Sequence, residues 1–210
     1  MNACSCPLPH GGRRVVLTGG PGAGKTAVLE LIHLFFCVHV RTLPEAAGVV
    51  YGGGFPRNER LEVRQASQRA IFHVQRELEA TEPPERAAVV LCDRGTVDGA
   101  AYWPGPGDLW SAVGTTQEQE LARYHAVIHL RTPLVPEVYP GDNPLRVETP
   151  AEAAVIDERI ARFWSGHPRV FEVKARPDFL AKAAEALAIL QGEVPACCRK
   201  STKPLLGSTA

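Results

Sequence analysis

Residues 19–26 read Gly-Gly-Pro-Gly-Ala-Gly-Lys-Thr and match the G-x-x-x-x-G-K-[ST] pattern of a phosphate-binding loop at every position. Backbone N–H groups can surround phosphate oxygens only at φ angles that residues with a Cβ resist, which explains the glycines. Lys25 would place its ammonium on the β- and γ-phosphates, and the Thr26 hydroxyl would ligate Mg²⁺. The residues assigned to nucleotide binding are Gly19, Gly20, Pro21, Gly22, Ala23, Gly24, Lys25 and Thr26.

The segments on either side of this loop are those that a phosphate-binding loop needs. An apolar run, residues 14–18, precedes it and predicts a strand. After the loop, apolar residues recur at helical spacing to about residue 36, so a helix would begin at the loop and turn its positive end toward the anion. A chance glycine-rich turn would lack both flanks. The sequence therefore predicts nucleotide phosphate binding.

Strands and helices alternate along the whole chain. Apolar runs predict strands at 14–18, 37–41, 87–92, 126–130 and 169–173. Helical periodicity or capping signals predict helices after the loop, at 59–80, at 118–123, from Thr149 onward and at 177–191. The glycine cluster at 52–56 and the segment 103–115 are predicted as loops. This alternation predicts an α/β fold with a five-stranded parallel sheet between two helical layers.

The length and composition fit one such domain. With 210 residues the chain can form a single α/β domain, predicted over 14–192, between a flexible leader at 1–13 and a disordered tail at 193–210. The 23 basic and 23 acidic residues balance, which argues against nucleic acid or an acidic membrane as a partner. The sequence shows no membrane span and no signal peptide, so a cytoplasmic location is expected. The oligomeric state is not readable from the sequence.

The six cysteines do not form a recognisable motif. Cys37 and Cys92 lie in apolar runs and are expected to be small core residues. The other four are in the two tails. A zinc site made of Cys4, Cys6, Cys197 and Cys198 would need the tails to meet, and neither pair has the usual C-x₂₋₄-C spacing, so it is not expected. The seven histidines show no metal-binding spacing either.

A second motif ends in a carboxylate. The apolar run 89–92 leads into Asp93, and in phosphate-loop enzymes such an aspartate holds Mg²⁺ beside the Ser or Thr of the loop. A helix-capping Asp at a strand-to-helix turn would look similar in sequence. Because the phosphate loop is complete, Asp93 and Thr26 are predicted as the metal residues.

Two more charged residues are candidates for acceptor chemistry. Arg94 could clamp a phosphate or the substrate with its planar guanidinium, or it could be a surface ion-pair partner. Glu45 follows the second predicted strand, at the carboxyl edge of the sheet where open α/β folds bind ligands. Its carboxylate could accept the proton of an attacking hydroxyl, or it could simply favour a helix N-terminus. Both readings remain open for each residue.

The segment of about 131–149 has the composition of a lid. It is rich in Pro and Gly, lies between two regular elements, and offers Arg131 and Arg146 to close over phosphates. Arginines on a closing segment stabilise charge on the transferred phosphoryl group and exclude water.

These motifs together resemble a known group. GGPGAGKT at 19–26, LPEAA at 43–47, CDRGTVDGAAY at 92–102, HLRTP at 129–133 and NPLRVET at 143–149 fall in the order of an AAA-like P-loop family. That family is similar to the nicotinamide riboside kinase part of the bacterial NAD regulator and, more distantly, to deoxynucleoside and thymidylate kinases. The resemblance covers about residues 14–190. It implies a three-layer αβα P-loop NTPase fold that uses ATP with Mg²⁺.

The resemblance also implies residue roles. Glu45 would be the acidic residue at the acceptor site, Asp93 and Arg94 an acid–arginine pair, and Arg146 the lid arginine. The predicted catalytic residues are thus Lys25, Glu45, Asp93, Arg94 and Arg146. The predicted acceptor pocket is bounded by Glu45, Phe55, Arg94, Asp98 and Tyr102.

Two functions from different classes follow. The first is an ATP-dependent kinase that phosphorylates a small molecule, such as a nucleoside, nucleotide or riboside, at a hydroxyl or phosphate. Either Glu45 or Asp93 would orient the acceptor. The second is a nucleotide-dependent switch or ATP- or GTP-binding module with slow hydrolysis. The guanine-reading N-K-x-D motif is absent from the sequence, which argues against a G protein. The identity of the acceptor is not readable.

Overall fold

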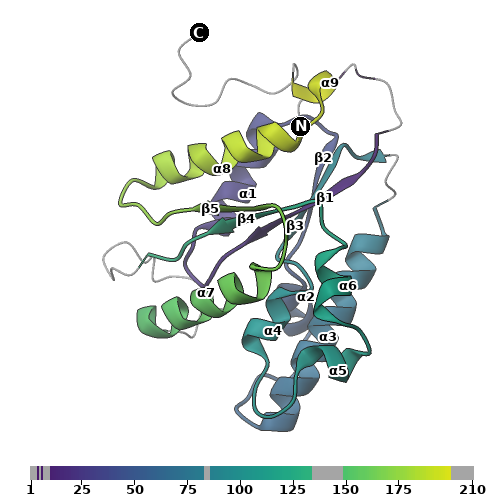
Figure 1. Ribbon diagram of the computed structural model, residues 1–210, viewed down its shortest axis with the longest axis vertical. Coiled ribbons are helices and arrows are strands. Elements are labelled where there is room, and N and C mark those ends of the chain that lie inside the picture. The colour runs from purple at the N-terminus through teal and green to yellow at the C-terminus, as the bar shows by residue number, and fades with distance from the viewer. Residues whose placement is uncertain (1–3, 5, 7–9, 83–85, 134–148, 200–210) are drawn as a thin grey trace.

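The computed structural model describes residues 4, 6, 10–82, 86–133 and 149–199 (Figure 1). Its strands are β1 (Arg13–Thr18), β2 (Val40–Leu43), β3 (Val89–Asp93), β4 (Ala126–Leu130) and β5 (Val170–Val173). Its first helices are α1 (Lys25–Phe35), α2 (Ala46–Gly52), α3 (Leu61–Ala80), α4 (Asp98–Tyr102) and α5 (Leu109–Val113). The remaining helices are α6 (Gln117–Leu121), α7 (Pro150–Trp164), α8 (Phe179–Glu193) and α9 (Ala196–Arg199).

The five strands form one parallel sheet in the order β2-β3-β1-β4-β5, which confirms the predicted fold class. In Figure 1 the sheet lies between α1 and α8 on one side and α7 and α4 on the other. Central strands covered on both faces need near-continuous apolar sequence, and β1, β3 and β4 provide it. All five strands end at the same edge of the sheet, so the turns that follow β1, β2 and β3 converge there.

Two apolar cores hold the layers together. One lies between the sheet and the α1–α8 layer, and it includes Val28, Ile32 and Leu187. The other lies between the sheet and the α4–α7 layer, and it includes Ile160 and the fully buried Trp164. Each core takes alternate residues of the same strands, as the twofold side-chain period of a strand requires.

The long helices agree with their sequence signals. The helix predicted at 59–80 is α3, and the helix predicted from Thr149 is α7. Thr149 and Glu152 form a capping box, in which the Thr149 hydroxyl accepts from the Glu152 N–H and the Glu152 carboxylate accepts from the Thr149 N–H. The last predicted helix continues past its expected stop and ends as α8 at Glu193.

Several short elements differ from the predictions. The second strand begins at Val40 rather than residue 37, because Cys37–Val40 forms a turn closed by a bond from the Val40 N–H to the Cys37 carbonyl at 3.0 Å. Helix α2 occupies part of the segment before the predicted glycine loop. Helix α5 lies within the predicted irregular segment 103–115, where the Asp108 carboxylate caps it through the Ser111 N–H. Helices this short give too little periodicity to be recognised in sequence.

The start of the predicted disordered tail is ordered. Val194 and Cys198 are buried against the α1–α8 core, and helix α9 lies between 196 and 199. Apolar side chains that dock on a core supply the free energy that orders such a segment. Residues 200–210 and most of the predicted lid (134–148, with Arg146) lie outside the described residues. Among the helices that the structure describes, none is long and apolar enough to cross a bilayer.

Candidate active site

The loop between β1 and α1 has the conformation that its sequence predicts. Gly19 has φ 142°, and a Cβ there would lie 2.1 Å from the Leu130 carbonyl oxygen, so no other residue fits. Gly24 has φ 91° and immediately precedes α1. The loop therefore reverses the chain direction between β1 and α1, and the first N–H groups of α1 point toward the carboxyl edge of the sheet.

Lys25, the basic residue of this loop, is largely buried. Its side chain is only 9% exposed, and its Nζ donates to the Gly19 carbonyl at 2.9 Å and to the Gly20 carbonyl at 3.2 Å. Burial and, to a smaller extent, the charge of Arg94 lower the pKa of the Lys25 ammonium to about 8, against the opposing effect of Asp93. The ammonium is thus still mostly charged at neutral pH, and an anion in the loop would raise its pKa again.

Arg94 crosses the site from the end of β3. Its backbone is left-handed, with φ 69°, the one such non-glycine residue among those described. The guanidinium donates from Nε to Glu45 Oε1 at 2.5 Å and from Nη1 to the Gly19 carbonyl at 3.2 Å. Such backbone strain persists only where surrounding contacts enforce it, and it clusters at functional sites. Arg94 does form an ion pair, as one reading of the sequence allowed, but it does so with Glu45 at a mostly buried position and not on the surface.

Glu45 is the N-cap residue of α2 and directly follows β2. Burial opposes its ionisation, but the charges of Arg94 and Lys25 outweigh burial and hold the pKa of Glu45 below its usual value. The carboxylate is consequently ionised at neutral pH while it lies at the cavity wall. Glu45 thus precedes a helix and also lines the cavity, a position that is compatible with both sequence interpretations.

Asp98 is buried, and its carboxylate already accepts several hydrogen bonds from the protein. It is 2% exposed, and its oxygens accept from the Thr18 hydroxyl, the Gly95 N–H at 3.0 Å and Trp164 Nε1 at 3.2 Å. Arg94 Nη1 also lies 3.4 Å from Asp98 Oδ1. These contacts fix the turn after β3, so Asp98 positions Arg94 in addition to lining the cavity.

Asp93 has the features of a ligand for a cation. Its Oδ1 is buried and has no hydrogen-bond partner among the described residues. Burial raises the pKa of Asp93 to about 6, Lys25 opposes that shift, and Glu45 adds to it. A buried carboxylate oxygen without a partner is unfavourable unless a cation or ligand meets it. Asp93 and Thr26 both line the same cavity, so these two residues fit a Mg²⁺ ion.

A cavity of about 350 Å³ joins these groups. Its wall includes the phosphate loop from Pro21 to Ala27 and the predicted residues Glu45, Asp93, Arg94, Asp98 and Tyr102. The remaining residue of the predicted acceptor pocket, Phe55, is not part of this wall, because it lies beyond the end of α2, where its N–H donates to the Val50 carbonyl. Residues that the sequence did not point to are Tyr51, Arg57, Gln68, Ile71, Phe72 and Gln75.

Two residues outside the motif support the phosphate loop. Asp157 on α7 accepts from the Gly20 N–H at 2.8 Å and bonds to His129 Nε2 at 2.9 Å. Lys182 on α8 donates to the Ala23 carbonyl at 2.8 Å. In the sequence, each of these residues is marked only by being a polar residue on the buried side of a helix. His129 itself is buried in the core and is paired with Asp157.

The predicted lid arginine Arg131 is not available to a phosphate. It pairs with Asp157 at 3.2 Å and with Glu158, both on α7. Arg146 lies outside the described residues.

Comparison with known proteins decides the family. A family model described as "AAA domain" matches residues 14–179, which is most of the chain. The chain belongs to the AAA domain family. No curated protein matches it in sequence. The matched residues include the phosphate loop, the turn at Asp93 and Arg94, and helix α7, which carries Asp157.

Solved structures share the fold of this AAA domain. NadR in complex with NR is similar with a TM-score of 0.67 and 16% identity, over 88% of this chain and 52% of that one. NadR in complex with NAD and AMP-PNP has a TM-score of 0.61 and 13% sequence identity, over 95% of this chain and 52% of the NadR chain. Deoxyadenosine kinase from M. mycoides with bound dATP has a TM-score of 0.59 and 12% sequence identity, over 85% of this chain and 98% of the kinase chain. The chain thus spans about half the length of the NadR chains. The predicted resemblance is confirmed.

We expect the Asp157→Ala variant of this AAA domain to lose about 1–3 kcal/mol of unfolding free energy, because the Gly20 N–H and the His129 ring would both lose their buried acceptor. Urea denaturation monitored by tryptophan fluorescence would measure it. The neighbouring variant Glu158→Ala removes a mostly exposed ion pair and should cost less than about 1 kcal/mol. Equal losses in the two variants would contradict the role assigned to Asp157.

Proposed function

We propose that the protein is an ATP-dependent kinase that transfers a phosphoryl group to a small molecule of the nucleoside, nucleotide or riboside class, with Mg²⁺. The observation that carries the proposal is the Arg94–Glu45 pair, which lies on the wall of the same cavity as the phosphate loop. An enzyme that only hydrolyses ATP needs the phosphate loop and a water molecule. This cavity also presents the ionised carboxylate of Glu45 and the guanidinium of Arg94, which could bind a second ligand. The solved structures of similar fold hold NR, NAD and AMP-PNP, or dATP, and these compounds support that ligand class.

The donor half of the reaction falls to the loop and Lys25. The backbone N–H groups of residues 19–26 would bind the phosphate oxygens, and the Lys25 ammonium would move from the loop carbonyls onto the β- and γ-phosphates. A positive group placed where negative charge develops lowers the barrier most when water is excluded. Under the resemblance, Arg146 keeps a proposed role as the lid arginine.

The acceptor half falls to Glu45 and Arg94. Arg94 holds Glu45 Oε1, so the second oxygen of this carboxylate is the group that would accept a hydrogen bond from the acceptor hydroxyl. As the hydroxyl oxygen attacks the γ-phosphorus and the bond to the β-phosphate oxygen breaks, the hydroxyl proton would pass to Glu45. We assign Glu45 rather than Asp93 to this step, since the unpartnered oxygen of Asp93 fits a metal.

Thr26 and Asp93 would hold the Mg²⁺ ion. When bound, such an ion would supply positive charge that offsets the negative charge developing on the transferred phosphoryl group.

The pKa of Asp93 leads to a stability prediction for Asp93→Asn. The folded-state pKa of about 6 is above the unfolded value, so the stability that the protonated carboxyl provides is lost as pH rises through about 6. Without nucleotide and metal, Asp93→Asn should be more stable than the natural protein by about 1–3 kcal/mol at pH 8, and by much less at pH 4.5. Urea denaturation at both pH values would show it.

The control for this variant is Glu118→Gln, which neutralises an exposed carboxylate and should stay within about 0.5 kcal/mol at either pH. A destabilised Asp93→Asn at pH 8 would mean that the Asp93 carboxylate is already satisfied in the nucleotide-free protein.

The proposed function is tested by measuring ADP formation from ATP and Mg²⁺ against a panel of nucleosides, nucleotides and pyridine ribosides. One acceptor should raise the rate at least tenfold over the rate without acceptor, and mass spectrometry should find it phosphorylated. Slow ADP formation that no panel member changes, together with tight ATP binding, would instead favour the nucleotide-dependent switch.

A further inference from the structure

A cluster of thiols and imidazoles lies at the edge of the sheet opposite to the phosphate loop. Cys6 and His10 come from the leader, His39 from the turn that enters β2, and Cys198 from α9. The His39 carbonyl accepts from the Ala88 N–H at 2.8 Å, beside the start of β3, which places it at the amino edge of the sheet. Segments that are 192 positions apart in sequence thus meet at one point.

The ligand atoms of these four residues lie at the corners of a small tetrahedron. Cys6 Sγ is 3.3 Å from His10 Nε2, 3.0 Å from His39 Nδ1 and 3.3 Å from Cys198 Sγ. The two ring nitrogens are 3.3 Å apart. Cys198 Sγ is 3.7 Å from His10 Nε2 and 3.6 Å from His39 Nδ1. All six edges therefore lie between 3.0 and 3.7 Å.

Five of those six edges, at 3.3–3.7 Å, agree with the dimensions of one metal ion and its ligands, and the Cys6–His39 edge of 3.0 Å is shorter. Zinc bonds of about 2.3 Å to sulfur and about 2.0–2.1 Å to nitrogen, arranged tetrahedrally, separate neighbouring ligand atoms by about 3.3–3.8 Å. We propose that Cys6, His10, His39 and Cys198 bind one Zn²⁺ ion as a Cys₂His₂ site. Two thiolates and two imidazoles form a ligand set that suits zinc, whereas hard cations such as Mg²⁺ need oxygen ligands.

The site is of the structural kind. Four protein ligands complete a tetrahedral zinc shell and leave no open position for water or substrate. His39 and Cys198 are buried, and Cys198 is 0% exposed. The ion would fasten the leader and α9 to the turn before β2. Metal affinity would therefore appear as stability of the folded chain, because the unfolded chain holds these ligands far apart.

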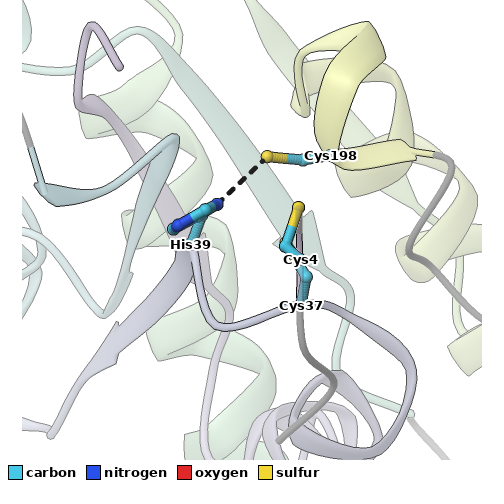
Figure 2. Close-up of side chains that lie close together, drawn as sticks. All are labelled: Cys4, Cys37, His39 and Cys198. Carbon is cyan, nitrogen blue, oxygen red and sulfur yellow. Dashed lines mark hydrogen bonds between the residues drawn. The ribbon is translucent and has the colours of Figure 1, made fainter. Parts of the chain in front are cut away.

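Two further cysteines border the cluster. Figure 2 shows Cys4 and Cys37 beside His39 and Cys198, and these four ligand atoms also lie within 4.8 Å of one another. This set shares two ligands with the first, so one ion could use only one of the two sets at a time. We choose the set with Cys6 and His10 because five of its six edges lie in the range expected around a zinc ion.

The cluster revises two expectations from the sequence. The tails do meet, although Cys197 is exposed and its Sγ lies 4.0 Å from Cys198 Sγ, outside both sets. Histidines complete the site, and Cys37 is a buried neighbour of it rather than only a core residue. Spacing rules could not reveal the whole site, because its four ligands come from three separate segments: the leader, the turn before β2, and α9.

Metal analysis of the full chain tests the proposal. The chain, expressed with zinc and dialysed against metal-free buffer, should carry about one zinc per molecule by plasma mass spectrometry. Replacing zinc by Co²⁺ in the natural protein should give the visible absorption bands of a tetrahedral site together with sulfur-to-cobalt charge transfer. Cys198→Ser should lose at least nine-tenths of the zinc, whereas the adjacent Cys197→Ser should keep it.

The proposal also has outcomes that would overturn it. The natural protein fails the test if it binds less than about a tenth of an equivalent of zinc and shows no tetrahedral cobalt spectrum, and this result needs no variant that must fold. Retention of zinc by Cys198→Ser would exclude the cluster. Loss of zinc in Cys4→Ser with retention in Cys6→Ser would assign the ion to the other set. Recovery of a disulfide among these cysteines under non-reducing conditions, with no metal, would also exclude it.

Discussion

Lys25→Ala should lower the rate of ADP formation by about 10²–10³-fold at saturating ATP, which is the range for removing one preorganised positive donor from a transition state. The ammonium is buried at the loop carbonyls, so a phosphate that enters the loop meets it without a change in the backbone. Initial rates of ADP formation with the acceptor found in the panel would measure the loss. Circular dichroism should show an unchanged fold, since the ammonium makes hydrogen bonds only to loop carbonyls among the described residues.

The matched control for this variant is Lys174→Ala, which removes an exposed ammonium outside the cavity wall. Its rate should stay within about twofold of the natural protein, because an exposed charge that contacts no reacting group contributes little. If Lys25→Ala retained a third or more of the natural rate, the phosphate loop would not be the site of transfer. That result would count against the proposed kinase and against a hydrolytic switch alike.

Trp164→Ala should lower the free energy of unfolding by about 3–5 kcal/mol, the range for truncating a fully buried large aromatic. Trp164 is 0% exposed, it packs edge-to-face on Tyr124, and its ring leaves no room for a Cβ at Gly95. The variant would also leave Asp98 without the indole donor, next to the turn that carries Arg94. Urea denaturation followed by circular dichroism would measure the loss.

Trp164→Phe separates packing from hydrogen bonding. It keeps a ring in the core and loses the indole N–H, so it should cost less than the alanine variant. The partly buried Trp110, changed to alanine, serves as a second comparison and should also cost less, because part of its surface is already in water. A loss below about 1 kcal/mol for Trp164→Ala would mean that neighbouring side chains collapse into the space.

The sheet and the phosphate loop were predictable because their signals are local. Each central strand is a continuous apolar run, and the loop needs glycines at fixed offsets, so a window of eight residues contains the information. The capping box at Thr149 is local in the same way. Glu45, Asp93 and Arg94 were also predicted together, because the carboxyl ends of neighbouring parallel strands converge at one edge.

The remaining features depend on tertiary contacts. Asp157 and Lys182 look like ordinary polar helix residues until α7 and α8 pack against the loop. The sequence places Phe55 at the cavity, but in the structure Phe55 follows the end of α2 and Tyr51 of that helix lines the wall. The Cys–His cluster requires both tails to dock, and docking follows from burial of apolar neighbours such as Val194, not from any spacing.

The strand order has a consequence for synthesis of the chain on the ribosome. β1 is the first strand to leave the exit tunnel, yet it pairs only with β3 and β4, and β2 pairs only with β3. No strand pair of the described sheet can therefore close until Asp93 has emerged, and the central strand stays half-paired until Leu130 follows. Until Asp93 emerges, the apolar residues of β1 and β2 therefore have no strand partner in this sheet. Early encounter with a chaperone, more than the stability of the finished domain, would then decide the yield of folded protein.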